Sequence, residues 1–260
     1  MKQLTTDRIK DKLVKKLSEA KIKRKILLLS QNPTAEVNFY KNIIIKRCRD
    51  FGIVYVDKEF ENEDSSEILA YLKQCDREDA YIFLAPFAGG KDLSELKKKV
   101  ELTDLDAFTY KSLGMTMQGD ISSLPATARA IASFLEEKYT SFRGKNIVIA
   151  NTTMVIGKPL AMYLSSKSAT VSLINSKTKN SKEMIKNSDI FISAIGKANF
   201  YDKSYFRDQM LIVDVGTSYI DGKVYGDVAY ESIADMDVEI LTNKKGIGAI
   251  TTLKLLEGLI

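Results

Sequence analysis

Short apolar runs alternate with longer segments of helical periodicity along most of the chain. In the first 110 residues the apolar runs lie at 25–30, 53–56 and 81–84. The segments with a helical pattern lie at 1–22, 35–51, 65–75 and 91–100. Apolar runs of this length, bounded by turn residues, are typical of strands buried on both faces. Their alternation with helices predicts an α/β fold built on a parallel sheet.

The second half repeats this alternation. Its apolar runs lie at 147–150, 169–174, 190–194 and 210–214, and a helix is predicted over 125–139. The stretch 145–158 passes from a strand through a polar turn into a helix start, as in a nucleotide-binding βαβ unit. We therefore predict two α/β lobes, the second a Rossmann-type doubly wound parallel sheet. The first lobe is assigned to residues 1–118 and the second to 119–245, with a C-terminal helix at 246–260 that packs back on the first.

Composition narrows the chemistry. The chain has 260 residues, two cysteines, no histidine and a net charge of +5. The missing histidines exclude His-based acid–base catalysis and most zinc catalysis, and no spacing indicates a metal site. The mild, dispersed charge argues against nucleic-acid binding. Because there is no apolar run long enough to span a bilayer and no signal peptide, we expect a cytoplasmic protein that does not associate with membranes.

The polar turn after 147–150 is the first candidate site. Asn151 stands where dinucleotide-binding folds usually have a glycine, and asparagine tolerates left-handed backbone. Thr152 and Thr153 offer hydroxyl groups to a phosphate, while Gly157 lets the backbone approach closely. An ordinary turn that binds no ligand is the alternative.

The end of the next strand bears on the choice of cofactor. NAD enzymes generally have an acid there that binds the ribose hydroxyls. This chain has Ser176, Lys177 and Lys179, with no acid between 175 and 179. A dinucleotide bound here would therefore be NADP, whose ribose phosphate suits lysines. A solvated basic loop is the alternative.

The order of several motifs resembles the bifunctional methylenetetrahydrofolate dehydrogenase/methenyltetrahydrofolate cyclohydrolase family. The motifs of the second half are GKPLAMYL, ATVSLINSKT, SDIFISAIGK, IVDVG, DGKVYGDV and GIGAIT. Those of the first half are Asn32-Pro33, Pro86, the DLDAF run at 104–108 and the PATA run at 125–128. No single motif is decisive, but their order covers essentially the whole chain.

The resemblance implies a tetrahydrofolate-type carrier in a cleft between the lobes, NADP on the Rossmann lobe, and a homodimer built through that lobe. It implies two reactions of the one-carbon metabolism that serves purine biosynthesis: hydride transfer to the nicotinamide, then ring opening by water. Besides the polar turn, the family's cofactor positions fall on Ser176, Ala194, Gly196, Gly216 and Thr217. Its substrate positions fall on Tyr40, Leu84, Asp106, Gly246, Gly248 and Thr251.

The family's catalytic residues are only partly kept. Its aspartate is Asp106, and anchoring 35–51 on Gly52 puts its tyrosine at Tyr40. The lysine four residues after the tyrosine is then Ile44, and the glutamine is Leu84. Lys46 is the nearest later lysine and joins Tyr40 and Asp106 as a candidate catalytic residue.

Other departures accompany these. Anchoring on Pro33 instead would put Asn38 and Asn42 at the tyrosine and lysine positions, so the register of 35–51 is open. The arginine of the cofactor turn is Thr152, and Lys245 replaces a glycine before the final glycine loop.

Three functions remain open. The first is a divergent NADP-dependent methylenetetrahydrofolate dehydrogenase with weakened cyclohydrolase activity. The second is a non-catalytic paralogue that binds a folate, a nucleotide or a protein. The third is a Rossmann oxidoreductase that acts on another substrate.

Overall fold

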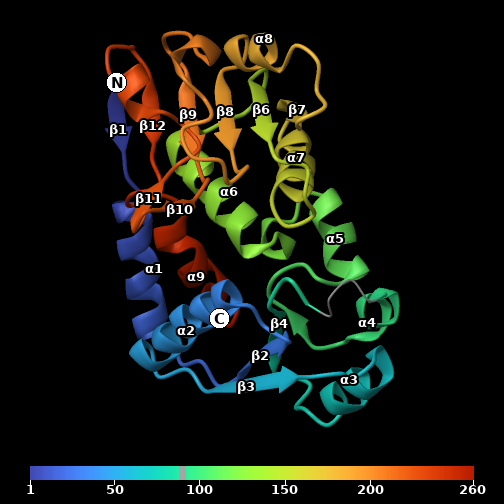
Figure 1. Cartoon of the computed structure of the whole chain (residues 1–260). Helices are drawn as coiled ribbons and strands as arrows, with labels where there is room; N and C mark the ends of the chain where they lie inside the picture. The colour runs from blue at the N-terminus through green and yellow to red at the C-terminus, as the bar shows by residue number, and fades with distance from the viewer. Residues whose placement is uncertain (88–91) are drawn as a thin grey trace.

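The computed structural model describes residues 1–87 and 92–260 and contains two parallel sheets in two lobes (Figure 1). The larger sheet has the order β1 (Lys2–Leu4), β12 (Glu239–Leu241), β9 (Leu211–Asp214), β8 (Ile190–Ser193), β6 (Asn146–Ala150) and β7 (Thr170–Ile174). The smaller sheet has the order β3 (Tyr55–Phe60), β2 (Ile26–Gln31), β4 (Ala80–Phe83) and β5 (Thr103–Asp104). The predicted α/β fold is confirmed.

Helices cover both faces of each sheet, because alternate strand residues point to opposite sides. The helices are α1 (Asp7–Glu19), α2 (Ala35–Asp50), α3 (Ser65–Leu72), α4 (Ser94–Lys99), α5 (Tyr110–Met117), α6 (Ala126–Lys138), α7 (Gly157–Ser166), α8 (Ser181–Lys186) and α9 (Gly248–Glu257). On β2, Ile26 and Leu28 pack toward α2, whereas Leu27 and Leu29 pack toward α3 and α4. The larger sheet has α6 and α7 on one face and α8 on the other.

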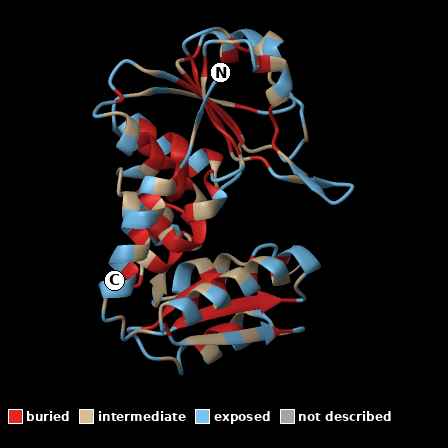
Figure 2. Ribbon diagram, turned by 90° about the vertical axis from the view of Figure 1, so that its left-hand side faces the viewer, coloured by how far each residue is buried: buried red, intermediate tan, exposed pale blue. Residues whose placement is uncertain are grey.

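One hydrophobic core joins the two lobes. It runs from Ile82 of the smaller sheet through Ile131 of α6 and Leu253 of α9 to Ile149 of the larger sheet. Figure 2 shows buried residues in both sheets and along the helices between them. Helix α9 packs against α1, α2 and α6. None of the described helices is long and apolar enough to cross a membrane.

The N-terminal segment differs from the prediction. Residues 1–22 were expected to form one helix within the first lobe, but Lys2–Leu4 form β1, which pairs in parallel with β12 of the larger sheet. The Lys2 Nζ atom also lies 2.9 Å from Glu239 Oε1. A three-residue edge strand is too short to show an alternating pattern, and it was therefore missed. Because these residues pair with the larger sheet, their assignment to the first lobe was wrong.

Strands β10 (Ser218–Ile220) and β11 (Lys223–Tyr225) form a hairpin apart from both sheets. Its turn residues, Asp221 and Gly222, have φ values of 49° and 75°. Left-handed backbone at both positions is the conformation that two-residue hairpin turns prefer. Tyr219 on this hairpin is 75% exposed.

Candidate functional site

Tyr40, Asp106 and Arg129 form one electrostatic group between α2 and the start of α6. Asp106 follows β5, and its Oδ1 atom accepts a hydrogen bond of 2.6 Å from the Ala126 N–H. Burial raises the pKa of Asp106 to about 6, while the Ala126 N–H and the Arg129 charge oppose that rise. Burial, assisted by Asp106, also raises the pKa of Tyr40. Tyr40 is therefore a neutral hydroxyl at neutral pH.

Asp104 prepares the loop that presents Asp106. Its carboxylate accepts hydrogen bonds from the N–H groups of Asp106, Phe108 and Thr109, and from the Thr109 and Ser112 hydroxyls. Both carboxylate oxygens of Asp104 thus accept hydrogen bonds from residues 106–112. Among the described residues, Asp106 Oδ2 has no hydrogen-bond partner, so this oxygen is the one available to a ligand.

The structure fixes the register of α2. Tyr40 lies within range of the Asp106 charge, and Ile44, one turn later, is fully buried in the core. Lys41 points elsewhere, because its Nζ atom lies 3.0 Å from Asp57 Oδ1 on β3. Lys46 is exposed, and six residues of helix turn it away from the Tyr40 face. The structure therefore does not bring Lys46 to Tyr40 and Asp106, and its assignment as a catalytic residue is corrected.

Leu84 also lies in the core. Its side chain is 1% exposed, and its N–H donates to the Leu29 carbonyl at 2.8 Å. An apolar side chain in this position continues the packing of β4 and offers no hydrogen bond. The Leu84 side chain is therefore buried, and the structure does not expose it for the substrate contact that the resemblance implies.

The glycine turn before α9 has mainly a structural role. A Cβ atom on Gly246 would lie 2.0 Å from the Thr242 carbonyl oxygen. The Thr6 hydroxyl donates to the Gly246 carbonyl at 2.9 Å, and the Thr251 hydroxyl donates to the Ile247 carbonyl at 2.9 Å. A Cβ atom on Gly248 would meet nothing within 4 Å, so Gly248 is the member of this turn that leaves open space.

Asn151 organises the predicted cofactor turn from within. Its Oδ1 atom accepts hydrogen bonds from the N–H groups of Thr153 (2.9 Å) and Gly157 (3.0 Å). Its Nδ2 atom donates to the Ala194 carbonyl at 2.8 Å, which ties the turn to the end of β8. A Cβ atom on Gly157 would lie 1.8 Å from the Asn151 carbonyl oxygen, so only glycine fits there.

This arrangement uses the amide groups with which a helix start usually holds phosphate. The Gly157 N–H is bound to Asn151, and the N–H groups of Ile156 and Lys158 donate to Thr153. Pro159 has no N–H to offer. The amide groups at the start of α7 are therefore engaged within the turn itself.

The loop after β7 is closed by its own side chains. Asn175 Oδ1 accepts from the Lys177 N–H at 2.8 Å, and the Thr178 hydroxyl accepts from the Asn175 N–H at 3.0 Å. Ser176, Lys177 and Lys179 are exposed, and none of them has an ion-pair partner among the described residues. Two free ammonium groups thus stand at the carboxyl end of β7, where a dinucleotide ribose lies in this fold.

Two buried carboxylates fix the loops after β8 and β9. Asp227 accepts hydrogen bonds from the Ser193 hydroxyl and from the Ile195 and Lys197 N–H groups. A Cβ atom on Gly216 would lie 2.0 Å from the Asp227 carboxyl carbon. Gly216 is thus a packing position at the carboxyl end of β9.

Asp214 is the second of these carboxylates. It accepts hydrogen bonds from the N–H groups of Gly216, Asp227 and Val228 and from the Tyr230 hydroxyl. Burial raises its pKa to about 6. Above these loops, Gly196 has a φ of 65° with open space around it, and Thr217 is exposed.

Three polar residues of this region were not predicted from the sequence. Asp214 lies in the IVDVG motif, and Asp227 lies in the DGKVYGDV motif. The sequence signal for Asp214 is an acid at the end of a buried strand, and the signal for Asp227 is an acid directly before a valine. Arg129 is the only charged residue among the first ten of α6, a helix that is otherwise apolar or small there. A lone cation on such a helix is a signal of a buried charge.

Ala107 occupies a strained position beside the site. It stands where the resembled family has glycine, and its φ is 55°. Left-handed backbone costs a residue with a Cβ atom about 1–2 kcal/mol, of which glycine's greater freedom in the unfolded chain returns a part. Ala107→Gly should therefore raise the free energy of unfolding by about 1 kcal/mol in urea titrations. Ala130→Gly in α6 is the matched control and should lower it; an equal loss in both variants would contradict this prediction.

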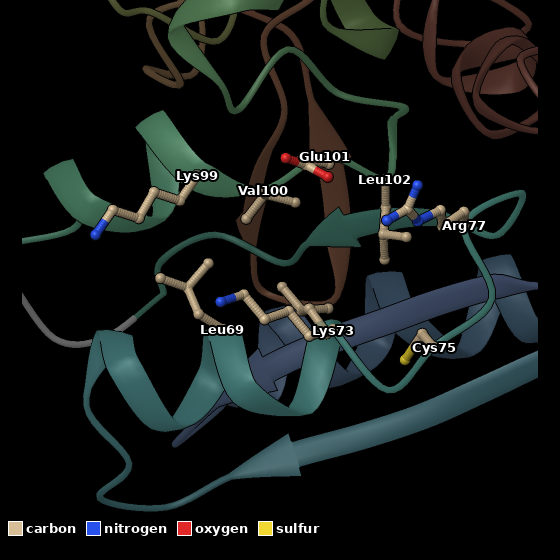
Figure 3. Close-up of a pocket in the computed structure, with 9 residues that line it drawn as sticks. Leu69, Lys73, Cys75, Arg77, Lys99, Val100, Glu101 and Leu102 are labelled. Carbon is tan, nitrogen blue, oxygen red and sulfur yellow. The ribbon is translucent and has the colours of Figure 1, made fainter.

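A separate pocket of about 410 Å³ lies in the first lobe between α3 and the connection from α4 to β5. Its lining combines leucine and valine side chains with charged ones, including Lys73, Arg77, Lys99 and Glu101 (Figure 3). None of the candidate site residues lines it. Among the described residues, no group of three or more Cys, Asp or Glu side chains could hold a metal ion.

Comparisons with known proteins agree with this layout. Residues 125–260 match the family model described as tetrahydrofolate dehydrogenase/cyclohydrolase, NAD(P)-binding domain. The bifunctional protein FolD of Clostridium novyi is 30% identical over 226 residues, covering 85% of this chain and 81% of that protein. The bifunctional protein FolD of Clostridium perfringens (strain 13 / Type A) is 31% identical over 224 residues, covering 84% and 81%.

Solved structures share the fold along the whole chain. The FolD methylenetetrahydrofolate dehydrogenase/cyclohydrolase of Campylobacter jejuni superposes with a TM-score of 0.90 at 23% identity, covering 100% of this chain and 97% of that one. The bifunctional enzyme of Thermoplasma acidophilum gives 0.86 at 23% identity, covering 99% and 96%. Because the family model matches more than half of the chain and relatives at 30% identity span most of it, this chain belongs to the tetrahydrofolate dehydrogenase/cyclohydrolase family.

Proposed function

We propose that this protein is an NADP-dependent methylenetetrahydrofolate dehydrogenase of one-carbon metabolism in which the cyclohydrolase step is weak. Family membership and the relatives named bifunctional FolD support the reaction class. One observation divides the two activities: Ile44 and Leu84, both buried in the core, stand at the positions of the family lysine and glutamine.

Asp106 and Tyr40 serve the first reaction by holding the carrier. Asp106 Oδ2 accepts hydrogen bonds from N–H groups at the aminopyrimidine edge of a pterin, and the neutral Tyr40 hydroxyl donates beside it. Bound NADP supplies the acceptor for the hydride. Because this transfer depends mainly on positioning, the chain needs no acid or base at the reacting carbon.

The second reaction lacks its proton acceptor. Addition of water to the methenyl product requires a group that can take a proton near neutral pH. Tyr40 is unsuited because burial raises its pKa, and Lys46 lies on another helix face. Asp106, whose pKa burial raises to about 6, is occupied by the pterin. We therefore expect most of the methenyl product to leave the site without hydrolysis.

The chain fits a dinucleotide at the carboxyl edge of β6, β7 and β8. Gly196 leaves open backbone there, and the Asn151 side chain holds the turn in shape. Lys177 and Lys179 are free to meet a ribose phosphate, which supports NADP over NAD. Thr152, Thr153, Ser176 and Thr217 complete the proposed contacts.

An absorbance assay tests this function. Purified protein mixed with methylenetetrahydrofolate and NADP should produce reduced cofactor and methenyl product in nearly equal amounts. Added bifunctional FolD from a relative should then consume the methenyl product, which controls for its stability. Reduced cofactor without methenyl product would show that cyclohydrolysis is retained. No turnover together with measurable folate binding by calorimetry would favour the non-catalytic paralogue.

The remaining proposals concern assembly and setting. A homodimer built through the second lobe is supported by the exposed apolar side chains Tyr219, Ile220 and Val224 on the β10–β11 hairpin. Light scattering of the purified protein would measure its mass. A cytoplasmic location and a role in purine biosynthesis are proposed from family membership alone.

A further inference from the structure

Arg129 is a buried cation with little direct hydrogen bonding. Its side chain lies on α6 and the residue is 6% exposed. One guanidinium nitrogen donates to the Leu105 carbonyl at 2.6 Å, whereas its buried Nε atom has no partner. Taking a cation out of water costs several kcal/mol unless nearby charges compensate. Negative charges nearby therefore have to stabilise the buried guanidinium group.

Four carboxylates surround this cation: Asp106, Glu257, Asp104 and Asp120. Three of them have other partners. Glu257 on α9 pairs with Lys16 and Lys254, Asp104 is bound within its own loop, and Asp120 accepts from Ser122 and Ser123. Asp106 alone keeps an oxygen without a described partner. The Arg129 charge therefore acts chiefly on the carboxylate that faces the ligand.

Two hydrogen bonds connect residues 105–106 to the first turn of α6. Arg129 donates to the carbonyl of Leu105, the residue before Asp106. Ala126, one turn before Arg129 on α6, donates its N–H to Asp106 itself. Residues 105–106 are thus held against the first turn of α6 by one side chain and one backbone group.

We propose that Arg129 is a positioning residue for the proposed dehydrogenase: from beneath the site it fixes the Leu105–Asp106 backbone and keeps Asp106 charged for the pterin. The inference rests on the proposed function for its catalytic part. It also assigns a source of positive charge to a site in which Ile44 stands one turn after Tyr40 on α2.

The pH dependence follows from the groups around Asp106. Those groups are Tyr40 on α2, Arg129 on α6, Asp104 in its own loop and, through Arg129, Glu257 and Asp120. Burial raises the pKa of Asp106 to about 6, and Arg129 limits the rise. Since the ionised form binds the substrate, kcat/KM should increase as pH rises through about 6. Removing the Arg129 charge should move that midpoint to higher pH.

Two substitutions separate charge from hydrogen bonding. Arg129→Gln keeps a donor for Leu105 but loses the charge, and Arg129→Lys keeps the charge. Carbon-13 NMR of labelled aspartates, assigned with Asp106→Asn, reports the Asp106 titration without substrate. Arg129→Gln should raise its midpoint by about one pH unit and lower kcat/KM about tenfold at pH 5, about threefold at pH 6.5 and very little above pH 8. Arg129→Lys should leave the midpoint nearly unchanged, and exposed Arg143→Gln is the matched control.

The outcomes separate the two proposals. An unchanged Asp106 midpoint in Arg129→Gln, in an active enzyme, would overturn the role of Arg129 alone. An inactive wild type with a shifted midpoint would overturn the proposed function and with it the catalytic role. If Arg129→Gln does not fold, Arg129→Lys decides: an Asp106 midpoint raised well above the wild-type value, although the positive charge is kept, would contradict the proposal.

Discussion

Asp106→Ala should lower kcat/KM for methylenetetrahydrofolate oxidation by about 10- to 150-fold, because a hydrogen bond to a charged group contributes about 1.5–3 kcal/mol. The loss should appear mainly in KM, since Asp106 holds the carrier and does not act on the reacting carbon. The substitution also removes the carboxylate whose charge acts most strongly on the Arg129 cation. Steady-state kinetics with varied folate concentration measures both effects.

Two further variants sharpen this test. Asp106→Asn keeps an oxygen that can accept from the Ala126 N–H, so it should fold normally while losing the pH dependence near 6. Asp235→Asn removes an exposed carboxylate whose ion pair with Lys203 spans 3.4 Å, and it should leave the kinetics unchanged. Wild-type KM in Asp106→Ala would refute the assignment of Asp106 to the pterin.

Gly157→Ala should cost about 3 kcal/mol or more of unfolding free energy and abolish NADP binding. The new Cβ atom would lie 1.8 Å from the Asn151 carbonyl oxygen, which belongs to the backbone and cannot rotate away. Relief requires the turn to separate from α7, and this breaks the hydrogen bond from the Gly157 N–H to Asn151. Urea unfolding and calorimetric titration with NADP measure the two losses.

Gly114→Ala is the matched control for this substitution. Gly114 lies within α5, and a Cβ atom there would meet nothing within 4 Å. Alanine in that place should be neutral or slightly stabilising, because it restricts the unfolded chain. If Gly157→Ala and Gly114→Ala had equal stability and equal NADP affinity, the close packing of the turn on α7 would be irrelevant to both properties.

The sequence predicted the strands well because most of them are continuous apolar runs, which can be recognised in a single sequence. It placed Tyr40 and Asp106 at family motif positions, and the structure brings these two residues within range of each other's charge. Lys46 was chosen as the nearest later lysine, although a separation of six residues turns it away from the Tyr40 face of the helix. The hydrogen bonds that close the start of α7 depend on side-chain directions of Asn151 and Thr153, which no pattern encodes.

The buried charges show a second limit. Arg129 appeared as one cation on an apolar helix, and its role depends on four carboxylates that lie outside this helix. Asp214 and Asp227 were visible only as letters in motifs, although each holds backbone N–H groups of loops that meet in space. Polar networks of this kind are defined by tertiary contacts, so local propensity does not reveal them.

The pairing of β1 with β12 has a consequence for biosynthesis. Lys2 meets Glu239 across the sheet, so one strand leaves the ribosome long before its neighbour is translated. The strands β2, β3 and β4 lie close together in the chain and can assemble early. Until β12 arrives, the edge of β9 lacks a neighbour on that side. Strand β1 therefore stays unpaired for most of the protein's synthesis, and the edge of β9 is open from its own translation until β12 follows. These are the intervals in which a chaperone protects such surfaces.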